Sequence, residues 1–295
     1  MINETALFGG RERMLESDGR EGIADALDHA SLEARLAHHG VLLLRGFSGG
    51  VLDFSELIQR CSRRVTLDPA RRYTATNAQL VDAGTEAIGL HLENGNAPLL
   101  PDVIWFFCEL AASAGSQTTI CDGEAALSAL PAAAIAALEG KPIAFERRVP
   151  EEAWKRYVIK ELGLADEPAA VGRSHLERME ALSPNTRLTR LDDGAIRYRF
   201  ETEAIHPTRF SSAPAFANSL LGPSNGYEPP LIEFANGTPI PDALWEAMAT
   251  ATESVTREVD WQTGDVVIID NTRYMHGRRA ILDDRRVIHN AQSYL

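Results

Sequence analysis

The sequence of 295 residues has few cysteines, no long apolar run and no excess of basic residues. Its three cysteines, Cys61, Cys108 and Cys121, form no C-x-x-C pair, so we expect neither a cysteine-rich zinc site nor a disulfide framework. No apolar stretch approaches the roughly 20 residues of a transmembrane helix, and the N-terminus lacks the basic and apolar segments of a secretion signal. These absences predict a cytoplasmic protein that has no membrane partner.

The charge balance excludes another class of partner. The chain has 42 acidic residues against 29 Lys and Arg, a formal net charge of −13. An acidic surface repels a polyanion, so we expect no nucleic-acid partner. The charge is compatible with a cationic or zwitterionic small-molecule substrate, and it also favours solubility. We find no internal repeat, and the sequence does not indicate an oligomeric state.

Two stretches far apart in the chain carry residues that bind metals. His91 and Glu93 are two residues apart, so in an extended segment their side chains point to the same side. His276 follows a second apolar strand, residues 266–269. Two imidazoles and one carboxylate on one face of a metal form the facial triad of non-haem Fe(II) oxygenases. His206 is a rival for the distal histidine, but no apolar strand with an arginine follows it.

An arginine follows His276 inside an apolar strand pattern. Its guanidinium can bind a carboxylate through two parallel hydrogen bonds. Arg285 and Arg286 both lie at this position, and because neighbours in a strand alternate between faces, only one of them can point inward. A metal triad with a downstream arginine is typical of dioxygenases that use 2-oxoglutarate as cosubstrate.

Several motifs together resemble one family, the taurine dioxygenase and clavaminate synthase-like superfamily. In chain order they are GVLLLRGF (40–47), HLE (91–93), GSQTTICDG (115–123), WQTGD (261–265), DNTR (270–273) and HGR (276–278). The resemblance covers most of the chain. It implies an Fe(II)- and 2-oxoglutarate-dependent oxygenase that consumes O2. Most members have Asp at the carboxylate position, whereas this chain has Glu93, as the clavaminate synthase-like members do.

The resemblance also implies roles for residues around the metal. It identifies Arg286 as the arginine that holds 2-oxoglutarate, with Thr118 as its hydrogen-bonding partner. Four residues beyond, where some members place a substrate-binding arginine, this chain has Asn290, which argues against a sulfonate substrate bound in the manner of taurine. Further candidates for substrate contact are four polar residues near the motifs: Asn94, Asn96, Asn218 and Arg278.

Short strands separated by turn signals predict the fold class. We expect an α+β, mainly β protein with a double-stranded β-helix core, the jelly-roll or cupin-like architecture, flanked by helices. Because the triad residues lie near opposite ends of the chain and must meet, we expect one domain over residues 1–295. Residues 150–183 read as a helical insertion or lid within it, and residues 1–20 as a loosely held arm.

The predicted function is hydroxylation of a small molecule, such as an amino acid or a natural-product intermediate, with desaturation and cyclisation as alternative outcomes. Two other readings stay open at this point. One is a non-catalytic, cupin-like protein that binds a metal or small molecule, and the other is a metal oxygenase that does not use 2-oxoglutarate.

Overall fold

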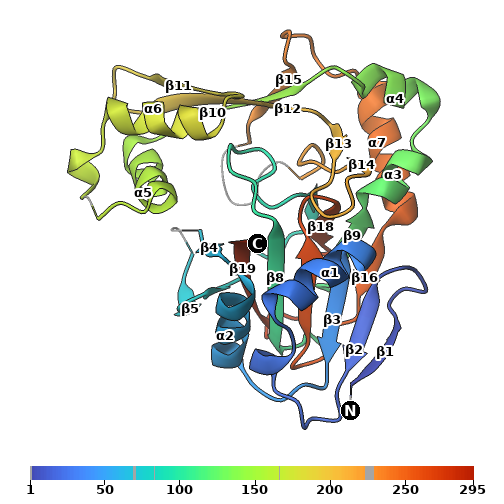
Figure 1. The fold of residues 1–295 in the computed structure, drawn as a ribbon. Coiled ribbons are helices and arrows are strands. Elements are labelled where there is room, and N and C mark those ends of the chain that lie inside the picture. Colours follow the sequence, from blue (N-terminus) through green and yellow to red (C-terminus); the bar gives the residue numbers. More distant parts are fainter. Residues whose placement is uncertain (1, 69–70, 83, 166, 223–228) are drawn as a thin grey trace.

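Two β-sheets packed against each other form the body of the molecule (Figure 1). The structure, a computed structural model, describes residues 2–68, 71–82, 84–165, 167–222 and 229–295. Helices cover the outer faces of the two sheets, and a helical arm extends to the upper left of the view. The predicted double-stranded β-helix is confirmed.

The larger sheet has nine strands within the described residues. Across the sheet they are β1 (Asn3–Ala6), β2 (Arg13–Glu16), β3 (Val41–Arg45), β17 (Val266–Asp270), β8 (Val103–Leu110), β19 (Val287–Tyr294), β6 (Ala78–Leu80) and β5 (Tyr73–Ala75), with β4 (Arg64–Thr66) beside β19. The expectation of a loose arm at residues 1–20 is wrong, because β2 pairs with β3 in parallel and β1 pairs with β2.

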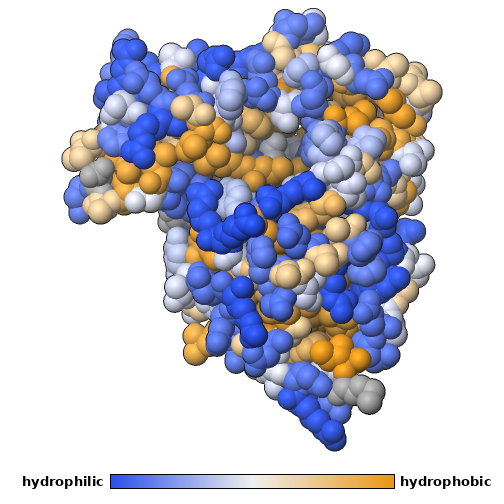
Figure 2. Space-filling model, in the orientation of Figure 1, coloured by the Kyte–Doolittle hydropathy of each residue, from blue (hydrophilic) through white to orange (hydrophobic). Residues whose placement is uncertain are grey.

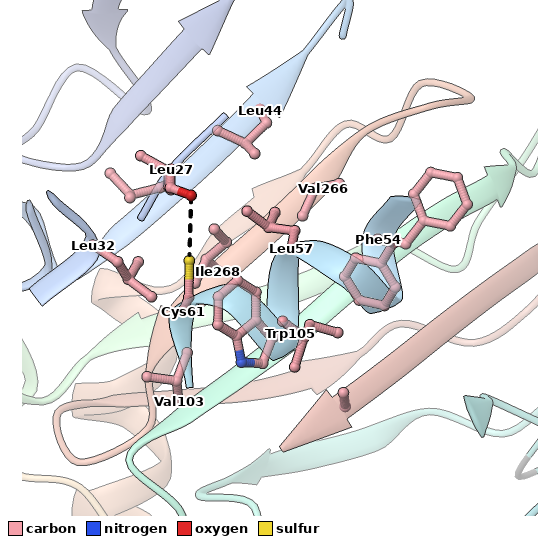
Figure 3. Close-up of a cluster of buried hydrophobic side chains, with 14 of the residues drawn as sticks. Leu27, Leu32, Leu44, Phe54, Leu57, Cys61, Val103, Trp105, Val266 and Ile268 are labelled. Atoms are coloured by element: carbon pink, nitrogen blue, oxygen red, sulfur yellow. Dashed lines mark hydrogen bonds between the residues drawn. The ribbon is translucent and has the colours of Figure 1, made fainter. Parts of the chain in front are cut away.

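The central strands of this sheet are buried on both faces, which explains their continuous apolar runs. On β3, Leu42 and Leu44 face outward, toward 3-10 helix η1 (Ile23–Asp25) and helices α1 (His29–His39) and α2 (Val51–Cys61). Figure 3 shows this layer, in which Phe54 and Leu57 of α2 pack over Trp105. Val41 and Leu43 alternate with them and face the second sheet.

The second sheet carries the strands that matter for function. Its order is β16 (Arg257–Val259), β9 (Thr118–Asp122), β18 (Tyr274–Arg278) and β7 (Ile88–His91). Its outer face packs against α3 (Gly123–Ala129), α4 (Ala132–Leu138) and α7 (Asp242–Val255). The segment between the arm and α7 includes the two-stranded ribbon β13 (Ile205–Pro207) and β14 (Pro214–Phe216).

The arm (residues 143–202) has its own sheet and two α-helices. Its elements are β10 (Ile143–Val149), α5 (Glu151–Leu162), η2 (Pro168–Ala170), α6 (Arg173–Leu182), β11 (Thr186–Arg190) and β12 (Ile196–Thr202), and β15 (Leu231–Phe234) joins the edge of its sheet. Residues 150–183, apart from residue 166, which lies outside the described residues, contain α5, η2 and α6, and their role as an insertion stays a prediction.

One buried carboxylate ties the arm to the jelly roll. The side chain of Glu161 on α5 is 1% exposed. It accepts hydrogen bonds from the Thr66 hydroxyl at 2.9 Å and from the Arg64 guanidinium at 3.2 Å, both on β4. Since a buried charge is costly unless it is paired, this contact favours the arm lying against β4.

Among the described residues, no helix combines the length and the apolar character needed to cross a bilayer.

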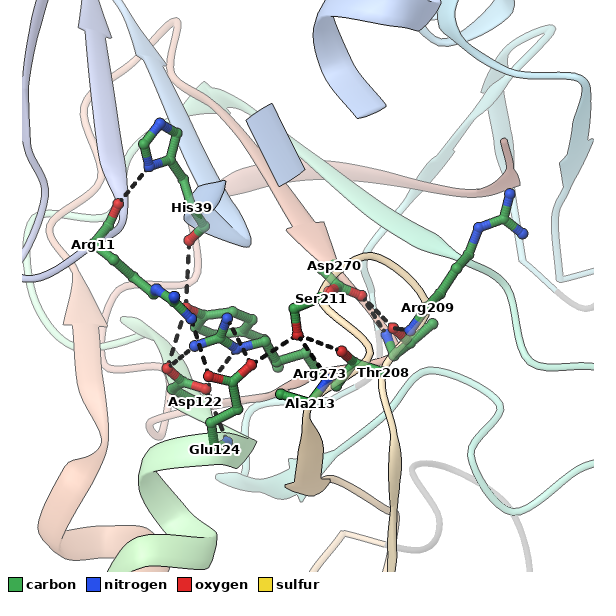
Figure 4. A network of polar contacts seen from close by, with 12 residues as sticks. Arg11, His39, Asp122, Glu124, Thr208, Arg209, Ser211, Ala213, Asp270 and Arg273 are labelled. Atoms are coloured by element: carbon green, nitrogen blue, oxygen red, sulfur yellow. Dashed lines mark hydrogen bonds and ion pairs between the residues drawn. The ribbon is translucent and has the colours of Figure 1, made fainter. Parts of the chain in front are cut away.

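A buried ion-pair network joins β9 to β18 (Figure 4). Arg273 is 1% exposed and binds Asp122 with two nitrogens, one of them at 2.8 Å, and its third nitrogen lies 3.0 Å from Glu124. The hydroxyl of Tyr274 donates to Glu12 of the N-terminal segment at 3.1 Å. The network therefore connects three parts of the chain that are far apart in sequence.

We expect Arg273→Ala to lower the free energy of unfolding by about 3–5 kcal/mol, because it leaves the carboxylate of Asp122, 16% exposed, without its cation. Urea denaturation measures the loss. The matched control is Arg11→Ala, which removes an exposed ion pair with the same acid, Glu124, and should cost less than about 1 kcal/mol. Equal losses in the two variants would show that burial does not control the strength of this network.

Candidate metal centre and its two cavities

Strand pairing brings the two histidines together. In the antiparallel pair β7 and β18, His276 lies directly opposite His91, although 185 positions separate them in the chain. Gly277 permits this approach, because a Cβ atom there would lie 2.5 Å from the carbonyl oxygen of Ile88. Glu93 lies two residues beyond His91, in the turn that follows β7.

The three side chains converge on one point. One ligand atom from each of His91, Glu93 and His276 lies within 4.8 Å of the other two. The Glu93 Oε2 atom is 4.0 Å from Nε2 of His91 and 3.5 Å from Nε2 of His276. Within the described part of the chain, this is the group of His, Cys, Asp and Glu side chains whose geometry suits a metal.

The hydrogen bonds of His91 fix its tautomer. Its Nδ1 atom lies 2.8 Å from the carbonyl oxygen of Gly89, which can only accept, so Nδ1 carries the proton. Burial and the neighbouring His276 lower the pKa of His91 to about 4, so the ring is neutral at neutral pH. The lone pair of Nε2 therefore faces Glu93 and His276, as metal binding requires.

Glu93 is held at both its backbone and its side chain. The Asn271 side chain accepts from the Glu93 amide at 2.8 Å and donates to its carbonyl at 3.0 Å. The Gln292 amide donates to Oε1 at 2.9 Å, which leaves Oε2 toward the histidines. Burial raises the pKa of the Glu93 carboxyl, but the hydrogen bond with His276 and the charge of Arg71 outweigh it and lower the pKa to about 2.

A small cavity of about 40 Å³ opens beside the triad. Thr118 and Arg286 line it together with His91, Glu93 and His276. One terminal nitrogen of Arg286 is buried and has no hydrogen-bond partner among the described residues. Burial and the charge of Arg278 lower the pKa of Arg286 to about 10, so it stays a cation at neutral pH. A buried cation of this kind favours an anionic ligand.

The neighbouring arginine points the other way. Arg285 is exposed, and two of its nitrogens bind the carboxylate of Asp283 at 2.9 Å each. Of the two candidates, the structure therefore brings only Arg286 to the cavity.

A second, larger cavity of about 590 Å³ lies between the triad and the arm. His91, Glu93 and Arg71 line both cavities, so the two spaces meet at the triad. The opposite wall comes from α5, α6 and the arm strands, and Figure 2 shows apolar residues along the lower edge of the arm. A volume of this size is typical of sites that bind small organic molecules.

Comparison with known proteins agrees with this arrangement. Residues 14–292 match the model of the taurine catabolism dioxygenase TauD, TfdA family. The chain belongs to the TauD/TfdA family. It is 26% identical over 286 residues to the dapdiamide synthesis protein DdaC of Enterobacter agglomerans, covering 90% of this chain and 85% of that one. It is 23% identical over 282 residues to a clavaminate synthase-like protein of Arabidopsis thaliana, covering 87% and 82%.

A solved structure shares the fold. PvcB from Pseudomonas aeruginosa, described as an Fe, alpha-ketoglutarate dependent oxygenase from an isonitrile synthetic pathway, superposes with a TM-score of 0.62 at 15% identity, covering 99% of this chain and 91% of that one. As a TauD/TfdA member, the chain is a dioxygenase that uses Fe(II), 2-oxoglutarate and O2. The readings as a non-catalytic binding protein and as an oxygenase without 2-oxoglutarate are thereby set aside.

The four residues predicted to contact substrate lie in different places. Asn94 and Asn96 line the large cavity. Arg278 lines the small one, and one of its nitrogens donates to the carbonyl oxygens of Gly84 and Glu86. Asn218 lines neither cavity, because its amide donates to the Ala204 carbonyl and accepts from the Leu220 amide. The structure therefore places Asn218 in support of a loop.

The sequence patterns did not predict the roles of three residues that lie around Glu93. The position of Gln292 could have been predicted from strand alternation. Every second residue of β19 faces the interior, namely Ile288, Asn290 and Gln292. Asn271 was quoted within a motif, but no role followed from it. Arg71 lies outside any strand or motif, so its approach to the triad depends on tertiary structure alone.

Proposed function

We propose that His91, Glu93 and His276 hold Fe(II), leaving the side toward the two cavities open for other ligands. The observation that carries the proposal is the convergence of a neutral imidazole, an anionic carboxylate and a second imidazole on one point. This donor set is typical of non-haem Fe(II) oxygenases. When bound, iron and 2-oxoglutarate supply the oxidising chemistry, in which O2 is consumed and succinate and CO2 are released.

We propose that the small cavity holds 2-oxoglutarate. Arg286 would bind its far carboxylate through the buried nitrogen that has no partner among the described residues. Thr118 lies on the same cavity, and its hydroxyl accepts a hydrogen bond from the Trp261 indole at 3.0 Å. Because a hydroxyl has one proton, this contact leaves the Thr118 proton available for a carboxylate oxygen.

The large cavity would then hold the substrate, next to the open side of the metal. Asn94 and Asn96 are our candidates for polar contacts there. The names of DdaC and PvcB refer to biosynthetic pathways, which supports a natural-product intermediate or an amino acid as the substrate class. We propose hydroxylation as the reaction, with desaturation or cyclisation as alternative outcomes. Cytoplasmic localisation stays a prediction.

Residues 150–183 would act as the cover of this cavity within one catalytic domain. The support is that α5 and α6 line the wall opposite the triad, while Glu161 fastens α5 to β4. A helical element that packs on the outside of a core can open locally without unfolding that core.

The ligand assignment predicts a spectrum. Addition of Fe(II) and 2-oxoglutarate without oxygen should give the weak visible charge-transfer band of this enzyme class. We expect His91→Ala and His276→Ala to lose the band, because each removes one of three ligands. His206→Ala should keep it, since that ring is hydrogen-bonded to the Ala217 carbonyl at 2.7 Å. A band of full strength in the first two variants would refute the assignment.

Gln292 should tune the metal site without binding the metal. Gln292→Leu frees Oε1 of Glu93, so we expect Mn(II) affinity, measured by electron paramagnetic resonance titration, to fall about 10- to 100-fold. Ser293→Ala is the control, because that hydroxyl accepts from Trp105 on the other face of β19. Unchanged affinity in Gln292→Leu would mean that the hydrogen bond does not position the carboxylate.

The two arginines allow a paired test of the cosubstrate site. Arg286→Ala should weaken 2-oxoglutarate binding by about 2–5 kcal/mol, since it leaves a buried carboxylate without its cation. Arg285→Ala should change it little, because Arg285 is exposed and binds Asp283. Titration of the charge-transfer band gives both affinities, and similar small effects would contradict the choice of Arg286.

The cover can be tested by hydrogen exchange. Glu161→Gln removes the buried charge that Arg64 and Thr66 bind, so amides of α5 and α6 should exchange faster while those of β8 and β17 stay unchanged. Glu152→Gln lies on the exposed side of the same helix, where it pairs with Arg156, and serves as the control. Equal exchange in Glu161→Gln and the unaltered protein would rule out a latch at this position.

A further inference from the structure

The large cavity is rich in cations, in contrast to the chain as a whole. Its lining residues include five cations and two acids, although the chain carries a net charge of −13. The cations are Arg71, Arg147, Arg148, Arg156 and Lys160, and the acids are Asp68 and Glu93. Arg148 and Arg156 are about half exposed and pair with Asp193 and Glu152. The charge of the cavity therefore argues against the cationic substrate that the net charge allowed.

Arg71 has the position of an anion-binding residue. It lines both cavities, and its charge acts on Glu93, so it lies beside the triad. Its Nε atom is 3.6 Å from Asp68, a loose ion pair. One of its terminal nitrogens is buried and has no hydrogen-bond partner among the described residues. A buried donor without a partner is unfavourable, so a ligand that accepts from it gains affinity.

Helix α5 brings two further donors to the same cavity. Tyr157 and Lys160 are three residues apart, so they lie on one side of the helix. The Tyr157 hydroxyl is buried and lacks a partner among the described residues, and burial raises its pKa, so it stays a neutral donor. Lys160 also lines the cavity, and its ammonium lies 3.6 Å from the buried carboxylate of Glu161.

Part of the arm's cavity wall is apolar, although Arg147, Arg148, Arg156 and Tyr198 also line it. Its apolar side chains come from α5, α6 and the strands that follow, and they include Ala153, Val158, Leu176, Met179, Leu188 and Ile196. An apolar surface of this extent favours an apolar ligand body through the hydrophobic effect. The cavity therefore combines cations beside the triad with an apolar surface under the arm, and Arg148 and Arg156 lie about half exposed on the arm.

We propose that the substrate is a carboxylic acid with an apolar body, whose carboxylate is bound by Arg71, Tyr157 and Lys160. This inference rests on the proposed function, since it assigns a substrate class to the same site. A carboxylate has lone pairs for three or four donors, and the planar guanidinium of Arg71 can bind it through two parallel hydrogen bonds. Its carboxylate end then lies beside the metal and its body extends beneath α5 and α6.

Three probes that share one apolar body test the class: 4-phenylbutyrate, 4-phenylbutan-1-ol and 4-phenylbutylammonium. Their affinities are measured by calorimetry on the protein loaded with Fe(II) and 2-oxoglutarate without oxygen. The carboxylate should bind at least about tenfold more tightly than the alcohol, and the ammonium more weakly than either. Equal affinity for carboxylate and alcohol, or tightest binding of the ammonium, would overturn the proposal.

Variants then locate the head-group site. Arg71→Gln should reduce carboxylate affinity to about that of the alcohol, and Arg71→Lys and Tyr157→Phe should reduce it partly. Alcohol affinity should stay the same in all of them, which also shows that they fold. The control is Arg148→Gln, which alters a cation at the exposed rim and should keep the preference. A full preference in Arg71→Gln would refute the role of Arg71.

The experiments distinguish an error in the substrate class from an error in the metal ligands. If the charge-transfer band forms but the probes show no head-group preference, the substrate class is wrong and the metal site stands. If metal-free protein shows the preference but no band forms with Fe(II) and 2-oxoglutarate, the cavity assignment stands and the ligand assignment is wrong.

Discussion

The pairing of β7 with β18 is the constraint on which the site depends. It sets His276 opposite His91, and a one-residue slip would turn one of the two rings to the other face of the sheet. Several features hold this register. Gly277 leaves room for the Ile88 carbonyl, Arg273 binds Asp122 across β9, and Asn271 holds the backbone of Glu93. The same segment that supplies the distal histidine therefore also positions the carboxylate.

The charge of the cavities is opposite in sign to the net charge of the chain. Acidic residues dominate the composition, yet the two cavities beside the triad are lined by several arginines. The small cavity is lined by Arg286, Arg278 and Arg71. Because water screens charges less in a cavity than at the surface, these arginines attract an anion more strongly than exposed ones do. An acidic exterior and a basic interior can act together, because the exterior keeps the protein soluble while the interior selects anions.

Much of the site could be predicted from local patterns. Period-two spacing predicted that His91 and Glu93 share a side, although Glu93 lies in a turn. Alternation left Arg285 and Arg286 as alternatives, and the family resemblance selected Arg286; both precede β19, which begins at Val287. The sheet-forming strands were readable as apolar runs because they are buried on both faces. The N-terminal strands were missed, since β1 and β2 are short and polar and form by pairing, β2 with β3 and β1 with β2.

Local sequence patterns do not predict which residues from distant parts of the chain lie close together in the fold. Arg71 and Lys160 carry no local sign of a shared cavity, because one lies in a loop and the other on a helix of the arm. Net charge was a poor guide for the same reason, since it averages over surfaces that never meet the substrate. Asn218 lies in a recognisable motif, but its hydrogen bonds are internal.

The strand order has a consequence for the sequence in which the protein folds. In the second sheet β18 lies between β7 and β9, and in the larger sheet β17 lies between β3 and β8. Both sheets therefore lack a central strand until residues 266–278 are available. A growing chain that has not yet released these residues cannot close either sheet, and its exposed strand edges need protection from other chains. With the proposed ligands, iron can be captured only after His276 has been synthesised, which couples loading of the metal to closure of the second sheet.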